Sequence, residues 1–138
     1  MSRENIEIVR RLLDAHEKQD FETVYAIYDP QIVWRIGRIE QLTSVGIEPT
    51  YVGHDGVRTF WREWLNAWET VSFEYEEFID AGDRVIVVLS QRMRGRTSGA
   101  EVDMRSYVQM WTVRGGRIVE MELFESREEA LRAVGLEE

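Results

Sequence analysis

Hydrophobic residues follow a helical spacing in the first half of the chain and alternate with polar residues in the second half. In residues 2–19 the apolar positions recur every three or four residues, which predicts an amphipathic helix. This predicted face consists of Ile6, Val9, Leu13 and His16. Asp20 can cap a second helix, which must end before Pro30 because the residue preceding a proline avoids helical geometry.

A third helix is predicted over residues 54–69, where three tryptophans fall within eight residues. Its apolar stripe has a four-three-four spacing that places the side chains on one face: Val57, Trp61, Trp64 and Trp68. Trp68 lies nearest the helix end, so we expect it to be purely structural, and Trp61 or Trp64 to border a cavity. A short strand at residues 31–36 and a loop-like segment at residues 37–53 precede this helix.

From residue 71 onward the hydrophobic period changes to two, which predicts four strands. They span residues 71–79, 84–94, 102–113 and 117–124, and the short turns between them require antiparallel neighbours. Ser126 and Glu129 form a capping box for a last helix, which Gly135 ends. The pattern predicts an α+β fold, with helices packed on a curved, mainly antiparallel sheet, in a single domain of residues 1–138.

Strand alternation assigns side chains to the two faces of this sheet. Most of the apolar set should face the helices and surround a pocket, and the residues predicted to border it are Trp61, Trp64, Met104, Val108, Met121 and Leu123. The opposite face would carry Arg105, Tyr107, Gln109 and Trp111. Aromatic and charged residues are mixed there, which favours a homodimer interface.

Composition excludes several classes of function. The net charge is −9 and no basic patch occurs, so we expect neither nucleic acid nor an anionic membrane as a partner. The chain has no cysteine and two histidines, and no phosphate loop or metal-spaced cluster, so we expect no metal and no cofactor. No apolar signal stretch opens the sequence, and a soluble cytoplasmic protein is the default expectation.

Several stretches resemble the SnoaL-like polyketide cyclase branch of the nuclear-transport-factor-2-like superfamily. They are GHDGVRTFWREW, FIDAGDRVIVV, MWTVRGGRIVEMELF and SREEALRAVGL, and the resemblance covers essentially the whole chain. It implies a cystatin-like cone, in which an apolar pocket lies between the concave face of the sheet and the helices. Proteins of this superfamily include isomerases, cyclases and hydrolases as well as non-catalytic binding domains.

Two residues are candidates for acid or base chemistry. Glu125 is in phase with the apolar set, and the resemblance implies an acid directly after the last-strand aromatic, as in Phe124-Glu125. In an apolar cavity its pKa would be raised; alternatively it is a solvated glutamate at the strand end. His16 continues the apolar stripe of the first helix, at a height where the resemblance implies ligand contact, and alternatively it is structural.

Two further residues are candidates for ligand binding. Arg35 would face solvent if Ile32 and Trp34 face inward, whereas the resemblance implies that Arg35 points into the pocket, where it would bind an anionic or carbonyl group. Ser106 and Arg35 replace acids that the resemblance to ketosteroid isomerases would require, so we do not expect that activity.

The function expected from these residues is cofactor-independent acid/base chemistry on a small, largely apolar carbonyl compound. Two alternatives stay open: a non-catalytic protein that binds a small ligand, and a dimerisation domain of the same fold. A buried Glu125 that faces His16 across a cavity would favour the enzyme.

Overall fold

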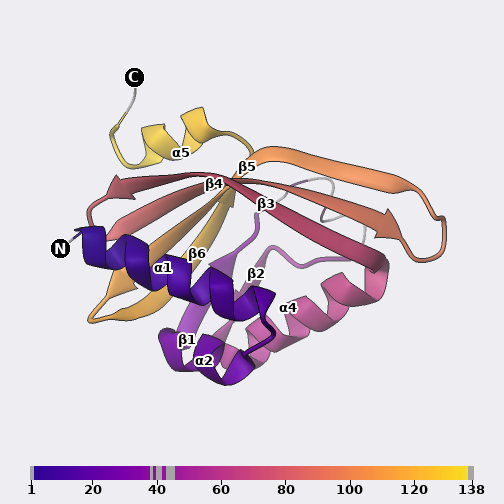
Figure 1. Ribbon diagram of the computed structural model, residues 1–138, viewed down its shortest axis with the longest axis horizontal. Helices are drawn as coiled ribbons and strands as arrows, with labels where there is room; N and C mark the ends of the chain where they lie inside the picture. The colour runs from indigo at the N-terminus through magenta and orange to yellow at the C-terminus, as the bar shows by residue number, and fades with distance from the viewer. Residues whose placement is uncertain (1, 38, 40–41, 43–45, 137–138) are drawn as a thin grey trace.

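Six strands form one sheet, in the order β2-β1-β6-β5-β4-β3, in the computed structural model of the chain (Figure 1). The structure describes residues 2–37, 39, 42 and 46–136. The elements in chain order are α1 (Ser2–Glu17), α2 (Phe21–Ile27), β1 (Tyr28–Arg35), β2 (Thr50–Val52), α4 (Gly53–Ala67), β3 (Trp68–Ala81), β4 (Arg84–Gly95), β5 (Glu101–Arg114), β6 (Arg117–Phe124) and α5 (Arg127–Ala133).

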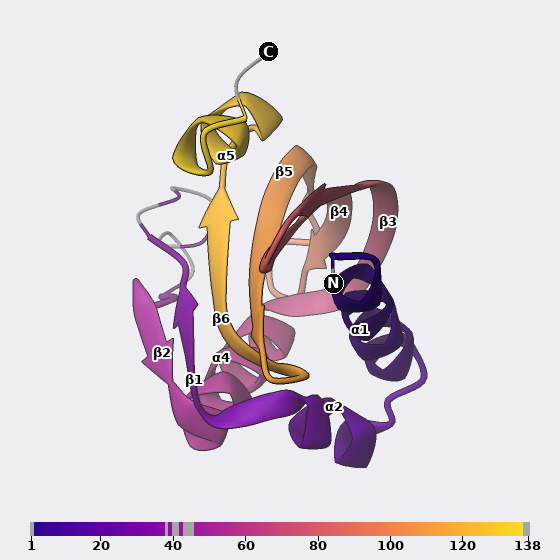
Figure 2. The same ribbon diagram turned by 90° about the vertical axis from the view of Figure 1, so that its left-hand side faces the viewer.

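Strands β3 to β6 form the predicted antiparallel meander, and β1 pairs with β6 in parallel. Figure 2 shows the sheet curving around α1, with α2 and α4 at its lower end and α5 outside. The predicted α+β fold, with helices packed on a curved and mainly antiparallel sheet, is confirmed. β1, the first strand of the chain, pairs with β6, the last one, and the two strands together form one wall of the concave side.

The two short helices begin at the caps expected from the sequence. The Asp20 carboxylate accepts a hydrogen bond from the Thr23 amide (3.3 Å) at the start of α2, and Ser126 Oγ accepts one from the Glu129 amide (3.2 Å) at the start of α5. Each bond satisfies a backbone donor that has no partner within its helix. These caps fix where α2 and α5 leave the sheet.

Hydrophobic side chains fill both sides of the sheet. The main cluster lies under α1, α2 and α4 and includes Val85, Val87 and Leu89 of β4, whereas Ile86 and Val88 point to the other side and pack with Ala130 and Leu131 of α5. The alternation along β4 therefore separates two cores, as a period of two requires. The helix α5 covers the outer core (Figure 1).

A bulge in β5 reverses the alternation that the sequence pattern predicts. The β4–β5 register shifts between Leu89 and Gln91, and Ser106 adopts a left-handed backbone with φ of 53°. Met104, before the bulge, faces the main core as predicted. After it, the prediction that Val108 faces the same side is wrong, because one extra residue moves every following side chain to the other face, and Met110 lies with Val108 in the outer core.

The same bulge removes the predicted dimer face. Tyr107 and Trp111 are 5% and 1% exposed and belong to the main core, whereas Arg105 is exposed. The four residues predicted to form one outer surface therefore lie on different sides of the sheet. The homodimer stays a prediction, but this surface does not exist as proposed.

Two element boundaries also differ from the predictions. Helix α4 ends at Ala67, and Trp68 opens β3 instead of closing the helix. The segment predicted as a loop over residues 37–53 contains the short strand β2, and its residues 38, 40–41 and 43–45 lie outside the described part of the chain. Among the described helices, none has the length and apolar character that a membrane crossing needs.

Candidate functional site

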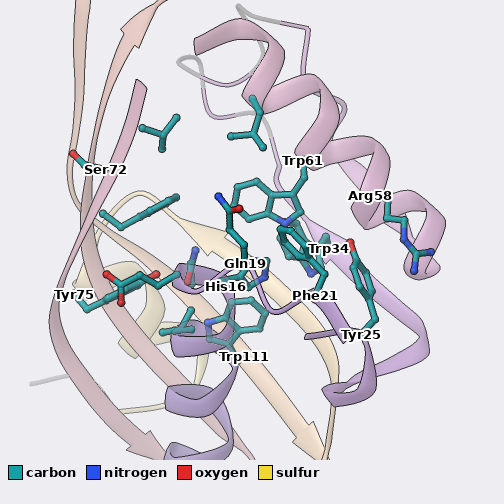
Figure 3. A pocket seen from close by; sticks show the side chains of 16 residues that line it. His16, Gln19, Phe21, Tyr25, Trp34, Arg58, Trp61, Ser72, Tyr75 and Trp111 are labelled. Carbon is teal, nitrogen blue, oxygen red and sulfur yellow. The ribbon is translucent and has the colours of Figure 1, made fainter. Parts of the chain in front are cut away.

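A cavity of about 690 Å³ lies on the concave side of the sheet, between the end of α1, the start of α2, helix α4 and strands β3 and β5 (Figure 3). This size is within the range of small-molecule binding sites. The lining residues are Leu13, His16, Glu17, Gln19, Phe21, Tyr25, Trp34, Arg58, Trp61, Leu65, Val71, Ser72, Phe73, Tyr75, Gln109 and Trp111.

Half of the lining residues carry aromatic rings, His16 included, and Trp61 contacts several of them. The Trp61 ring lies 5.2 Å from the His16 ring, 5.9 Å from Trp34 and 6.5 Å from Phe73, measured between centroids. Trp34 in turn meets Trp111 edge to face at 6.1 Å. Edge-to-face pairs of this kind hold the rings in fixed orientations, so the wall is preformed.

His16 brings an ionisable group into this aromatic wall. Its Nε2 lies 3.2 Å from the hydroxyl of Tyr28, a residue that is 1% exposed. Burial lowers the pKa of His16 to about 4, because the charged imidazolium loses its water. Burial also raises the pKa of Tyr28 well above its ordinary value. At neutral pH both groups are therefore uncharged.

The cavity also contains polar and charged groups nearer to water. Burial, together with the neighbouring carboxylate of Glu17, raises the pKa of Tyr75 to about 12. The guanidinium of Arg58 stacks on the Tyr25 ring at 4.2 Å, on the side of that ring away from Trp61 (Figure 3). Glu17 is the one carboxylate among the lining residues, and Arg58 is the one cation.

Several buried polar atoms of the wall have no partner among the described residues. They are the indole N–H groups of Trp34, Trp61 and Trp111 and the Oε1 of Gln109. An unpaired buried polar atom is costly, so these groups lower the stability of the wall. Three of the four groups are donors. In the described part of the chain, no group of three or more His, Asp or Glu side chains is arranged to hold a metal ion.

Among the residues predicted for the site, His16 and Trp61 line the cavity. Trp64, Met104 and Met121 are instead core residues with 1–5% exposure, and Leu123 packs partly buried against the same core. The prediction that these four border the pocket is wrong, because they fill the space behind its wall. The Trp64 indole donates to Gln91 Oε1 (2.9 Å), which satisfies its N–H inside the core.

The other predicted residues lie elsewhere. Glu125 follows β6 as an exposed residue and does not line the cavity, so the prediction that it points into the apolar set is wrong. Arg35 is exposed and pairs with Glu120 on the outer side of β6, while Ile32 and Trp34 face inward as alternation predicts. Val108 packs in the outer core beside α5.

Ser106 also lies outside the cavity, in a separate polar cleft on the outer parts of β3, β4 and β5. Its Oγ donates to Glu76 Oε1 (3.0 Å), and its amide donates to Ser90 Oγ (2.9 Å). These bonds hold the bulge of β5 in place. Ser106 therefore has a structural partner for each of these two donors, and it does not contact the cavity.

Sequence reasoning missed several lining residues. Alternation favoured an inward Trp34, but the resemblance favoured Arg35, and the direction of this strand was left open. The contact of Trp34 with Trp61 depends on the parallel pairing of β1 with β6. Gln109 and Trp111 were assigned to the outer face because a bulge at Ser106 has no obvious sequence signal. A serine with positive φ is uncommon. Tyr25 could have been found from its place one helical turn after Phe21.

Comparisons with known proteins agree with this architecture. The family described as SnoaL-like domain matches residues 9–121, which confirms the family predicted from the sequence. A protein of unknown function from Burkholderia pseudomallei, described as NTF2-like, is 26% identical, with a TM-score of 0.77 over 97% of this chain and 98% of its own. No curated protein matches the chain.

Two further solved structures share the fold at lower identity. TerC, co-crystallised with polyporic acid, is 24% identical, with a TM-score of 0.75 over 95% of this chain and 97% of its own. A candidate polyketide cyclase from Sinorhizobium meliloti is 20% identical, with a TM-score of 0.62 over 85% of this chain and 93% of its own.

Proposed function

Because this chain belongs to the family of SnoaL-like domains, we propose that it binds a small, largely apolar carbonyl compound in the cavity and promotes proton transfer on it without a cofactor. The observation that carries the proposal is the position of His16, a neutral imidazole within a wall of tryptophan and tyrosine rings. Apolar walls with a few polar groups are typical of sites that bind small molecules.

His16 supports the chemistry as a hydrogen-bond donor. Tyr28 keeps its proton, and its hydroxyl donates to Nε2 of His16, so that the imidazole proton resides on Nδ1; this tautomer is assigned from the hydrogen-bond network. A neutral imidazole N–H can polarise a carbonyl group and make the adjacent C–H more acidic. Glu17, the carboxylate of the lining, would accept the proton that leaves this carbon.

Non-catalytic binding is the second candidate function. Glu17 is an exposed residue, so water competes for its carboxylate, and the predicted acid Glu125 lies outside the cavity. The aromatic wall suits ligand binding whether or not a proton moves. A homodimer also stays a proposal, with no surface assigned to it.

Proton exchange on a ketone probe separates these functions. We expect the protein to accelerate exchange of the C1 protons of 2-tetralone in D₂O at pH 7, followed by proton NMR. His16→Gln and Glu17→Gln should each slow the catalysed exchange at least about tenfold. This threshold is conservative, because one acid or base side chain typically contributes about 100-fold or more. Glu125→Gln is the matched control and should exchange like the parent protein.

Each other outcome has a definite meaning. Binding of 2-tetralone without accelerated exchange would establish the non-catalytic alternative. If Glu125→Gln loses exchange while Glu17→Gln keeps it in full, Glu125 and not Glu17 is the base. Absence of binding to any ketone probe, measured by quenching of tryptophan fluorescence, would contradict the proposed function as a whole.

A further inference from the structure

Three apolar residues that line the cavity are strongly exposed to solvent. Phe21, Leu65 and Phe73 are 49%, 50% and 38% exposed, and they come from α2, α4 and β3. We call these three residues the apolar rim. They account for three of the five large hydrophobic side chains that are exposed in the described part of the chain, the others being Val52 and Leu136.

The apolar rim is continuous with the aromatic wall. The Phe21 ring lies 6.3 Å from the His16 ring, and the Phe73 ring lies 6.5 Å from Trp61 and 6.4 Å from Tyr75. A molecule that contacts His16 and Trp61 can therefore extend onto Phe21 or Phe73, whose rings adjoin theirs. The rim is part of the ligand site and not a separate surface.

His16 is the hydrogen-bonding group of the wall that lies next to the rim. Its imidazole ring lies 5.2 Å from the Trp61 ring and 6.3 Å from the Phe21 ring, measured between centroids. A ligand whose carbonyl oxygen lies beside His16 can therefore place an apolar part on Phe21 and the other rim residues.

The size of the rim favours a small molecule over a protein partner. Three side chains exposed to this extent offer roughly 300 Å² of apolar surface, since a large aromatic residue buries about 150–250 Å² in full. A stable protein interface needs about 800 Å² on each partner. Four exposed polar residues also line the cavity and interrupt the apolar surface: Glu17, Gln19, Arg58 and Ser72.

We propose that the ligand is a two-part molecule, with a carbonyl-bearing end inside the cavity and an apolar chain that lies on Phe21, Leu65 and Phe73. This inference rests on the proposed function and adds the ligand class to it. The chain gains affinity because it covers hydrophobic surface that is otherwise in contact with water. It also shields the inner hydrogen bonds of the carbonyl from solvent.

A homologous series of phenyl ketones tests the inference. The probes are acetophenone, butyrophenone and hexanophenone, which differ only in the length of the alkyl chain, and Kd is measured by quenching of tryptophan fluorescence. We expect Kd to fall about fourfold for each added methylene, the value for burial of one CH₂ group. In the double variant Leu65→Gln, Phe73→Thr, the gain in affinity per added methylene should largely disappear.

The substitutions are chosen to keep the fold. Glutamine suits a helix and threonine suits a strand, and both sites are exposed. Val52→Thr removes a side chain that is 62% exposed on β2 and does not line the cavity, so it is the matched control and should keep the full dependence on chain length. Circular dichroism verifies folding of each variant.

Three results would overturn the inference. The first is a chain-length dependence that survives in the double variant, which would place the alkyl chain elsewhere. The second is an equal loss of acetophenone and hexanophenone affinity. The third is dissociation of an oligomer in the double variant by sedimentation velocity, which would show that a second copy covers the rim. In each case acetophenone binding to the parent protein would still support the proposed function. If none of the probes binds, both the proposed function and the two-part ligand are contradicted.

Discussion

The imidazole Nε2 of His16 and the hydroxyl of Tyr28 lie 3.2 Å apart, although the two residues belong to α1 and β1. Tyr28 is enclosed by protein, and its ring stacks on Trp111 with centroids 6.2 Å apart. The tyrosine is therefore a rigid support that orients the histidine in the cavity wall.

Removal of this hydroxyl should change the state of the histidine. In Tyr28→Phe, Nε2 of His16 loses its donor, so we expect part of the imidazole population to move its proton from Nδ1 to Nε2. Nitrogen-15 NMR of the imidazole measures this change directly. Stability should fall by about 1 kcal/mol for the lost hydrogen bond. Tyr25→Phe is the control, because its hydroxyl makes no hydrogen bond to a described residue; an unchanged His16 spectrum in Tyr28→Phe would contradict the assignment.

The stability of the protein should depend on pH through His16. Its pKa is about 4 in the folded protein and 6.5 as its ordinary value, so between these pH values the unfolded chain binds a proton that the folded chain does not. Stability therefore decreases as pH falls from about 6.5 to about 4, and the decrease amounts to about 2 kcal/mol at pH 5. Urea unfolding at pH 7 and pH 5 measures it. His16→Gln should remove most of this difference, and an equal difference in both proteins would exclude His16 as its source.

The neighbouring tryptophans of α4 should separate binding from stability. Trp64→Phe leaves Gln91 Oε1 without the indole donor inside the core, which should cost about 1–3 kcal/mol of unfolding free energy. Trp61→Phe removes an indole whose N–H has no partner among the described residues, so its cost should be smaller. Because Trp61 lines the cavity and Trp64 does not, only Trp61→Phe should weaken ketone binding, by about fivefold for about 1 kcal/mol of ring contact. Fluorescence titration measures ketone binding and urea unfolding measures stability in both variants. Weaker binding in Trp64→Phe, with unchanged binding in Trp61→Phe, would contradict the location of the site.

The bulge at Ser106 should tolerate glycine better than valine. Ser106 has φ of 53°, a conformation that glycine adopts freely and that a β-branched residue avoids. We expect Ser106→Val to lower the unfolding free energy by about 1–3 kcal/mol. Ser106→Gly should stay closer to the parent protein, since relief of strain offsets the lost bond to Glu76. Equal urea midpoints for the two variants would argue against a strained bulge.

The spacing of hydrophobic residues was sufficient to predict most of the elements. Helix α4 was predicted from the separation of Val57, Trp61 and Trp64, and the meander from alternation and short turns. These are local signals, since helix and strand periods are properties of neighbouring residues. The position of His16 on the cavity side of α1 followed from the same periods, whereas the direction of Trp34 was left open between alternation and the resemblance.

Glu125 shows where this reasoning fails. Its parity with Met121 and Leu123 was correct along β6, but the strand ends at Phe124 and the chain turns into α5, so the side chain no longer follows the pleat. The predicted strand 117–124 matches β6, so the error was to continue the alternation one residue past its end. Parity arguments are therefore weakest at strand ends, where this residue lies.

The sequence alone was enough for the fold class, the family and the aromatic character of the site, because hydrophobic period, turn residues and caps act over a few positions. The tertiary structure was needed for the composition of the cavity wall. One bulge at Ser106 placed Gln109 and Trp111 inside and Val108 outside, and the parallel pairing of β1 with β6 brought Trp34 beside Trp61. Both features depend on contacts between strands that are distant in the chain, and a pattern read along one segment carries no information about the register of its partner.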